Sequence, residues 1–239
     1  MGRQKRGLLE VNSVAKEFEP YGQQSRRIKE YFDGEAFSRW AAISTGKGNN
    51  FAQRKLIEGR QEIHDCLMEW IDPLEGKTLL DAGCGAGFLS DHFAHQGALV
   101  KGIDISTKMI AMAQERGQKN TTFEVCDLMS ENGNYDILVS MDVLIHYSIE
   151  DMPELLAHVL GRVRERAYIS FAPSTSWFRF LKVIGEKFSG SSKTTNAYLH
   201  PISEIEKILN NLGYRVTRKK LVSNIIYNAV LLEIYPTKD

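Results

Sequence analysis

Short apolar runs alternate with helix-like windows in the middle of the chain. The runs TLLDA, ALVKGID, TTFEV, YDILVSM and AYISFA are typical of buried strands. Between them, FLSDHFAHQ, STKMIAMAQERG and MPELLAHVLGRV carry apolar residues at helical spacing. Because strands that alternate with helices form βαβ units, residues 77–172 predict a mainly parallel sheet with helices on both faces and right-handed crossovers.

Helical spacing dominates the chain before this region. Apolar residues recur every three or four positions over 51–71, which predicts one long helix. Upstream, Ile28, Tyr31 and Phe32 share one face of an amphipathic helix, and a break at Asp33-Gly34 separates it from a second short helix. We therefore expect a helical N-terminal preface that can act as a lid.

The last third predicts a helical insertion and two closing strands. The windows WFRFLKVIGEKF and ISEIEKILNNLG flank a polar loop, so a helical insertion is expected over about 173–212. YRVTRKKLV and IIYNAVLLEIYP then form a hairpin that turns near Ser223-Asn224. The predicted fold class is α/β: a seven-stranded, mostly parallel sheet with an antiparallel terminal hairpin. The preface covers 1–75 and the ligand-binding domain 76–239.

Composition narrows the class of protein. Of 239 residues, 43% are hydrophobic, which is enough for a sizeable core, and 30 Lys+Arg balance 30 Asp+Glu. This balance argues against a nucleic-acid partner. No apolar run approaches the roughly 20 residues of a membrane span, and the three scattered cysteines form no metal-ligand pattern. We expect a cytoplasmic protein without an integral membrane segment or a metal site.

A glycine-rich turn, DAGCGAG, joins the first strand of the sheet to a helix. Gly83, Gly85 and Gly87 allow close approach of a ligand to the backbone and direct N–H groups toward an anionic group. Such a turn can bind a dinucleotide, bind S-adenosylmethionine, or serve packing alone. The dinucleotide fingerprint GxGxxG needs a third glycine where this chain has Phe88, whereas GxGxG holds.

Acidic residues at the ends of the next two strands extend this pattern. Asp104 ends the second strand, where its carboxylate can accept both hydrogen bonds of a ribose diol. Asp127 ends the third strand, where it can accept from an adenine amino group while Leu128 offers its backbone N–H. The order DAGCGAG, GIDIS, VCDL and YDILVSMDVLIHY favours S-adenosylmethionine over NAD as the cofactor.

Wider stretches resemble one family. Residues 78–172 are similar to class I S-adenosylmethionine-dependent methyltransferases with a Rossmann-like fold. The segments KEYFDGEAFSRW, DAGCGAGFLS, MDVLIHY, ISFAPST and IGEKFSGSSKTTNAYLH resemble the magnesium-protoporphyrin IX O-methyltransferase family of chlorophyll and bacteriochlorophyll synthesis. The resemblance covers most of residues 28–213. It implies an enzyme that esterifies a propionate carboxylate of magnesium protoporphyrin IX, and an association with other enzymes of tetrapyrrole synthesis.

The motifs and the resemblance together predict three groups of site residues. The predicted catalytic residues are His146 and Tyr31. The predicted cofactor contacts are Asp81, Gly83, Gly85, Gly87, Asp104, Ile105, Asp127, Leu128, Met141 and Asp142. The predicted substrate contacts are Tyr147, Trp177, Lys193, Tyr198 and His200, some of them in an aromatic and basic stretch that suits a flat apolar ligand carrying carboxylates.

Methyl transfer to a carboxylate chiefly requires positioning of the two reacting atoms. A carboxylic acid with a pKa of about 4.3 is already ionised at pH 7, so no strong base is needed. His146 follows the fourth strand at the carboxyl edge of the sheet, where it would orient the acceptor oxygen or remain a structural histidine. Tyr31 would close over the cofactor or simply pack, and Asp142 would hold the methionine amino group or cap a turn.

Two segments depart from the resembled family. After Trp40 the family has an arginine-rich stretch with a tyrosine where this chain reads AAISTGKG. Its last strands carry a TRFYxSR-like run, of which SNIIYNAVLLEIY keeps only Tyr227. Two alternatives therefore stay open: a methyltransferase for a different acid or hydroxyl acceptor, and a non-catalytic protein that binds tetrapyrroles.

Overall fold

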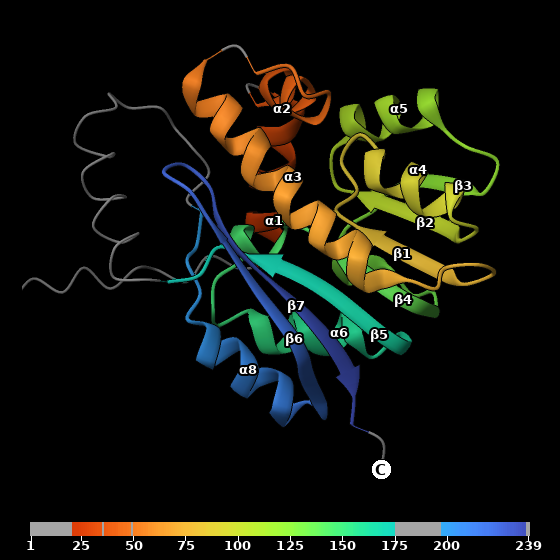
Figure 1. Cartoon of the computed structure of the whole chain (residues 1–239), viewed down its shortest axis with the longest axis vertical. Helices are drawn as coiled ribbons and strands as arrows, with labels where there is room; N and C mark the ends of the chain where they lie inside the picture. Colours follow the sequence, from red (N-terminus) through yellow and green to blue (C-terminus); the bar gives the residue numbers. More distant parts are fainter. Residues whose placement is uncertain (1–20, 35, 49, 175–196, 238–239) are drawn as a thin grey trace, which may run out of the picture.

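A seven-stranded sheet in the order β3-β2-β1-β4-β5-β7-β6 forms the centre of the molecule (Figure 1). The structure is a computed structural model that describes residues 21–34, 36–48, 50–174 and 197–237. The strands are β1 (Thr78–Ala82), β2 (Leu99–Asp104), β3 (Thr121–Val125), β4 (Tyr135–Ser140), β5 (Val163–Phe171), β6 (Tyr214–Ser223) and β7 (Asn228–Pro236). The first five pair in parallel and β7 is antiparallel to both its neighbours, which confirms the predicted sheet and terminal hairpin.

The helices precede and connect the strands as the periodicity predicts. Their bounds are α1 (Tyr21–Asp33), α2 (Phe37–Ser44), α3 (Phe51–Ile71), α4 (Phe88–His95), α5 (Thr107–Arg116), α6 (Met152–Leu160) and α8 (Ile202–Asn211), with 3₁₀ turns at η1 (Leu128–Ser130) and η2 (Leu144–His146). Side chains cap two of the α-helices: Asn50 accepts from the N–H of Gln53 at 2.8 Å, and Ser106 from that of Met109 at 3.2 Å.

The alternation of side chains along the strands divides the core between the two faces of the sheet. Leu79 packs with α3 and α4, whereas its neighbour Leu80 packs with α6 and α8. Leu231 and Leu232 of β7 alternate in the same way. Figure 1 shows α3 crossing one face while α6 and α8 cover the other. The carboxyl ends of β1, β2, β3 and β4 therefore form one edge to which α1, α2 and α3 have access.

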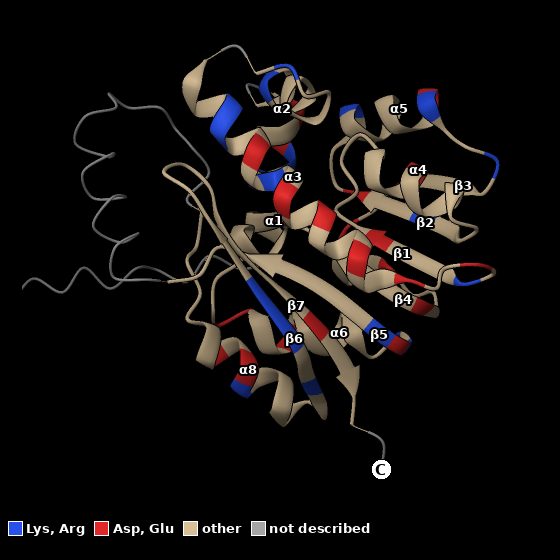
Figure 2. Ribbon diagram, viewed as in Figure 1, with Lys and Arg blue, Asp and Glu red and all other residues tan. Residues whose placement is uncertain are grey.

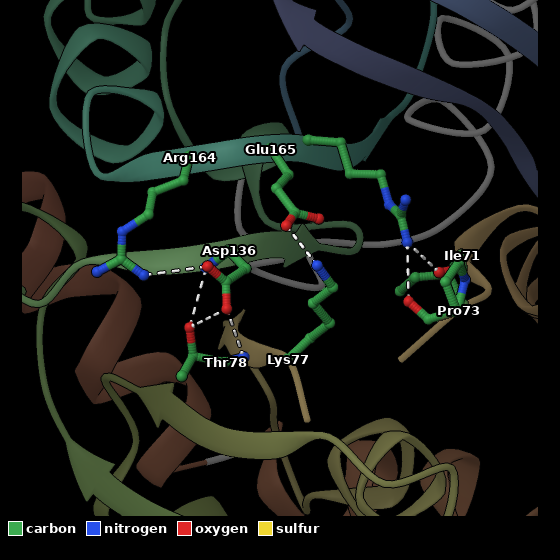
Figure 3. A network of polar contacts seen from close by, with 8 residues as sticks. Ile71, Pro73, Lys77, Thr78, Asp136, Arg164 and Glu165 are labelled. Atoms are coloured by element: carbon green, nitrogen blue, oxygen red, sulfur yellow. Dashed lines mark hydrogen bonds and ion pairs between the residues drawn. The ribbon is translucent and has the colours of Figure 1, made fainter. Parts of the chain in front are cut away.

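Polar contacts tie the opposite, amino-terminal edge together (Figure 3). Asp136 of β4 accepts from the N–H and the hydroxyl of Thr78 at 2.9 and 2.8 Å and pairs with Arg164 of β5 at 3.0 Å. Lys77 pairs with Glu165 beside them. These contacts fix the register of β1, β4 and β5 at the end of the sheet that is remote from the glycine turn.

Three element boundaries and one apolar position differ from prediction, and one of these boundaries is the start of β5 at Val163 in place of Ala167. Helix α6 ends at Leu160, three residues before the predicted end, because a glycine follows and β5 begins at Val163. Strand β7 begins at Asn228 and not at 225, because the Asn224 side chain accepts from the N–H groups of residues 226 and 227 and holds a turn. Phe51 is 54% exposed, although its spacing placed it on the apolar face of α3.

Gly59 permits α3 to approach the hairpin closely. A Cβ at this position would lie 2.4 Å from Cδ1 of Tyr227. We predict that Gly59→Ala lowers the free energy of unfolding by about 2 kcal/mol through overpacking. Gly22→Ala is the control, because a Cβ at Gly22 meets nothing within 4 Å and alanine favours the helix. Chemical denaturation checks both changes, and equal stability of the two variants would contradict the packing argument.

Candidate active site

The glycine turn between β1 and α4 leaves open space at its centre. Gly83, Gly85 and Gly87 have φ angles of 82°, 54° and 78°. A Cβ at Gly83 would lie 2.2 Å from Cγ2 of Val143, and one at Gly87 would lie 2.8 Å from Cζ of Phe123. A Cβ at Gly85 would meet nothing within 4 Å. Gly83 and Gly87 thus permit close packing of Val143 and Phe123, whereas the backbone at Gly85 has open space beside it.

Asp104 connects the end of β2 to this turn. Its Oδ2 accepts from the N–H of Gly85 at 2.9 Å, and its Oδ1 accepts from the N–H of Ser106 at 2.8 Å. Burial raises the pKa of Asp104 while these two bonds oppose the rise. Each carboxylate oxygen has a second lone pair, so the group can also accept hydrogen bonds from a diol.

A cavity of about 140 Å³ lies over the turn, and we call it the main cavity. Side chains of α1, α2 and α3 line it together with the glycine turn and the carboxyl ends of the strands. A second chamber of about 220 Å³ adjoins it and shares Arg60 and Met141 with its lining. The predicted residues in the lining of the main cavity are Gly83, Gly85, Asp104, Ile105, Leu128, Met141, Asp142, His146 and Tyr147.

Two predicted cofactor carboxylates lie outside the lining of the main cavity. Asp81 accepts from the hydroxyl of Ser90 at 2.6 Å and borders the second chamber, and burial raises its pKa to about 7. The carboxylate of Asp127 accepts from the hydroxyls of Tyr21 at 2.6 Å and Ser25, both on α1. The contact of Asp127 with an adenine stays a prediction, and in this structure two hydroxyls of the preface helix donate to its carboxylate.

His146, the first predicted catalytic residue, lies in an enclosed and largely apolar setting at the main cavity. Its ring meets that of Phe32 edge-on at 5.2 Å, and its backbone carbonyl accepts from Nε2 of Gln24 at 2.5 Å. Nδ1 is buried and has no hydrogen-bond partner among the described residues. Burial lowers the pKa of His146 to about 4 against the opposing charge of Asp142, so the ring is uncharged at pH 7.

Tyr31 does not line the main cavity. Its hydroxyl accepts a hydrogen bond from Arg39, and its ring lies edge-on to Phe32 at 5.2 Å. Phe32, one residue on, lines the main cavity instead. The structure thus places the predicted catalytic tyrosine one side chain away from the enclosed space, and a direct contact with the reacting atoms stays a prediction.

Arg60 is a site residue that the sequence reasoning missed. Its Nη1 lies 2.9 Å from Oδ2 of Asp142, and both side chains line the main cavity. Figure 2 shows basic positions toward the start of α3 and acidic ones toward its end. The signal was present in the periodicity, because Leu56, Arg60, Ile63 and Leu67 share one helical face on which a single charge interrupts an apolar row.

The substrate candidates near the 3₁₀ turn η2 lie at different depths. Tyr147 is buried, stacks on Tyr21 with ring centroids 5.6 Å apart, and lines the main cavity. Tyr198 donates its backbone N–H to the carbonyl of Ile145 at 2.7 Å, next to His146. The segment that follows β5 in sequence therefore returns to the same edge of the sheet.

His200 is a buried residue beside the 3₁₀ turn η2, and its contact with substrate stays a prediction. It is 1% exposed, its ring meets Phe171 at 6.0 Å, and its Nε2 lies 3.0 Å from the carbonyl oxygen of Leu144. It is not part of the lining of the main cavity. Trp177 and Lys193, with most of the predicted insertion, lie outside the described residues.

The described ranges contain no group of three or more His, Cys, Asp or Glu side chains arranged to hold a metal ion. None of the helices in these ranges combines the length and the apolar character that crossing a bilayer requires.

Comparisons with known proteins agree on one family. A family profile described as magnesium-protoporphyrin IX methyltransferase C-terminus matches residues 140–236, and a methyltransferase domain profile matches 79–166. The chain is 38% identical to a magnesium-protoporphyrin O-methyltransferase of Synechocystis, over 86% of the chain and 94% of that protein. It is 34% identical to the chloroplastic magnesium protoporphyrin IX methyltransferase of Arabidopsis thaliana, over 90% of the chain and 72% of that protein.

A solved structure extends this similarity to three dimensions. The crystal structure of magnesium protoporphyrin IX methyltransferase from Synechocystis with bound SAH superimposes with a TM-score of 0.81 at 35% identity. The superposition covers 88% of this chain and 99% of the crystallised one. The same protein has also been crystallised with bound SAM, at a TM-score of 0.77.

Proposed function

The chain belongs to the magnesium-protoporphyrin IX methyltransferase family, and from this premise we propose that it transfers a methyl group from S-adenosylmethionine to a propionate carboxylate of magnesium protoporphyrin IX. The main cavity is the observation that carries this proposal. The glycine turn, Asp104 and the uncharged His146 all line this cavity, and the rest of its wall is largely apolar. The reaction belongs to chlorophyll or bacteriochlorophyll synthesis.

The chemistry of the lining fits S-adenosylmethionine. Asp104 can accept hydrogen bonds from ribose hydroxyls, and the pair of Arg60 with Asp142 complements a group that carries one negative and one positive charge. Nδ1 of His146 and Nε1 of Trp40 are buried without partners among the described residues, and both side chains line the main cavity. Buried polar atoms without partners are rare, so these two favour a site built around a ligand.

The protein's part in the reaction is positioning. S-adenosylmethionine supplies a methyl group that an acceptor oxygen displaces in line from its sulfonium. The acceptor carboxylate is already ionised at neutral pH, so the protein needs to hold it and has little need to deprotonate it. We propose that His146, uncharged because burial lowers its pKa to about 4, orients the acceptor oxygen by one hydrogen bond.

Helix α1 covers the main cavity and would exclude water from it. Lys29 donates to the carbonyl of Ile105 at 3.0 Å, at the end of β2, and Gln24 donates to that of His146 after β4. Ile28 and Phe32 of the same helix complete the apolar wall. These contacts support the lid role of the N-terminal preface, since an enclosed site strengthens each charged contact within it.

Incubation with methyl-labelled S-adenosylmethionine tests the proposal. We expect label in magnesium protoporphyrin IX, and none in a porphyrin whose propionates are already esterified, because the ester lacks an acceptor oxygen. Transfer to a different acid or hydroxyl compound, with none to the porphyrin, would favour the alternative acceptor that the altered terminal strands left open. Tight porphyrin binding without transfer would favour a non-catalytic tetrapyrrole-binding protein. A cytoplasmic location and an association with other pathway enzymes stay predictions.

A further inference from the structure

Tyr227 stands just outside the main cavity and holds one of its charged residues. The residue precedes β7 in the terminal hairpin and is 7% exposed. Its hydroxyl donates to Oδ1 and Oδ2 of Asp142 at 3.0 and 3.1 Å. Burial raises the pKa of Tyr227 well above its ordinary value, so the hydroxyl remains a donor at any physiological pH.

Asp142 is held in an unusual backbone conformation by contacts from three elements. It is the one non-glycine residue in the described ranges with a positive φ, at 59°. Its N–H donates to Oγ of Ser170 at 2.8 Å, and that hydroxyl lies 3.1 Å from Oδ1. Left-handed backbone outside glycine is costly and persists where the surroundings fix it, which happens mostly at functional sites. Tyr227 supplies the contact from the hairpin.

The same tyrosine also sets the position of Arg60. Its ring packs on Gly59, where a side chain would collide with it, so α3 and the hairpin touch at this point. Arg60 is the next residue of α3, and its guanidinium reaches Asp142 at 2.9 Å. The hairpin therefore fixes both members of the ion pair, one through a hydroxyl and the other through a helix contact.

Three charged side chains line the main cavity among the described residues: Arg60, Asp104 and Asp142. His146 also lines it but is uncharged. Asp104 already accepts from the glycine turn at the end of β2. Among the described lining residues, Arg60 and Asp142 are the cation and anion that lie side by side. A zwitterionic amino acid group complements that arrangement, because its carboxylate can pair with the arginine and its ammonium with the aspartate.

We propose that Tyr227 is a positioning residue for the amino acid end of the cofactor, holding Asp142 so that it receives the ammonium group while Arg60 receives the carboxylate. The inference rests on the proposed use of S-adenosylmethionine.

Calorimetric titration with two ligands tests this role. S-adenosylhomocysteine carries the amino acid group, whereas 5′-methylthioadenosine has the same nucleoside without it. We expect Tyr227→Phe to weaken S-adenosylhomocysteine about 10-fold, as for lost hydrogen bonds to a charged group, and 5′-methylthioadenosine less than about twofold. In turnover, KM for S-adenosylmethionine should rise by a similar factor while kcat changes little.

Tyr168→Phe is the matched control. Its hydroxyl also donates to a carboxylate, Oε1 of Glu233 at 3.0 Å, and to the carbonyl of Trp70 at 3.0 Å, but it does not line the main cavity. This variant should lose stability and keep its affinity for both ligands. Ser170→Ala removes another contact to Asp142 and should repeat the selective loss, so it replaces Tyr227→Phe if that variant does not fold.

The outcomes separate this inference from the proposed function. Equal weakening of both ligands in Tyr227→Phe, or no weakening of either, overturns the positioning role while the cofactor assignment stands. Wild-type protein that binds neither ligand overturns the proposed function, and the positioning role with it.

Discussion

Replacement of His146 by alanine should lower kcat for methyl transfer by about 100-fold, the lower range for removal of a positioned acid–base group. The affinity for S-adenosylmethionine should change less than about threefold, because in the proposed reaction the ring contacts the acceptor oxygen and not the cofactor. Stopped assays under saturating substrate measure the first quantity, and calorimetry measures the second.

His95→Ala is the control for this change. His95 ends α4, away from the main cavity, where its Nδ1 lies 2.7 Å from the carbonyl oxygen of Asp91. Its removal should leave kcat unchanged. A parallel fall of kcat and cofactor affinity in His146→Ala would show structural damage in place of a positioning role, and an unchanged kcat would remove His146 from the reaction.

The lowered pKa of His146 should also make the stability of the protein depend on pH. Its pKa is about 4 in the folded protein against 6.5 in an ordinary setting, because burial disfavours the charged ring. Because the pKa of His146 is lower in the folded protein than in the unfolded chain, the unfolded chain binds the proton more readily. Its contribution to stability is therefore complete above about pH 6.5 and is lost as the pH falls toward 4. His146→Ala should reduce this acid-side loss of thermal stability.

Replacement of Asp104 by alanine should weaken S-adenosylmethionine binding by about 100-fold, the effect of losing two hydrogen bonds to a charged acceptor. The loss has two sources. The carboxylate is the proposed acceptor for the ribose hydroxyls, and it also holds the N–H of Gly85 at 2.9 Å, which shapes the centre of the glycine turn. Titration with S-adenosylhomocysteine measures the change.

Asp136→Ala offers a control of the same chemistry at the other edge of the sheet. Asp136 also accepts a backbone N–H, that of Thr78 at 2.9 Å, and pairs with Arg164, as Figure 3 shows. Its loss should lower stability and leave cofactor affinity unchanged. An Asp104→Ala variant that binds as tightly as the wild type would exclude this carboxylate from the nucleoside site.

The sheet could be predicted because its signals are local. Each of β1, β2 and β4 is a short, mainly apolar run bounded by turn residues, the glycine turn follows β1 directly, and Asp104 ends β2. Strand β3 has no buried residue, although its sequence was read as a buried strand. The start of β5 was missed because Val163 is followed by three consecutive charged residues and looks like the end of a helix. Arg164 bonds to Asp136 of β4 and Arg166 to the carbonyls of Ile71 and Pro73, which the sequence alone does not reveal.

The remaining parts of the site depend on contacts between distant segments. Arg60 reaches Asp142 across 82 positions, and Tyr227 reaches it across 85. Tyr21 lies 106 positions from Asp127 and donates a hydrogen bond to its carboxylate. Local motifs identify which strand ends face a ligand, but they do not show which helix or hairpin folds back onto them. The surroundings of Asp127 and His200 could therefore not be predicted, and Arg60 was missed.

The most direct test of the proposed reaction follows the labelled methyl group into its product. A carboxylate methylated on oxygen is an ester, which mild alkali hydrolyses to methanol, whereas a methylated hydroxyl is an ether that survives. After incubation with magnesium protoporphyrin IX, we predict label in the porphyrin that alkali releases quantitatively as methanol. Label that resists alkali, or label that never enters the porphyrin while another compound accepts it, would contradict methylation of a porphyrin carboxylate in this cavity.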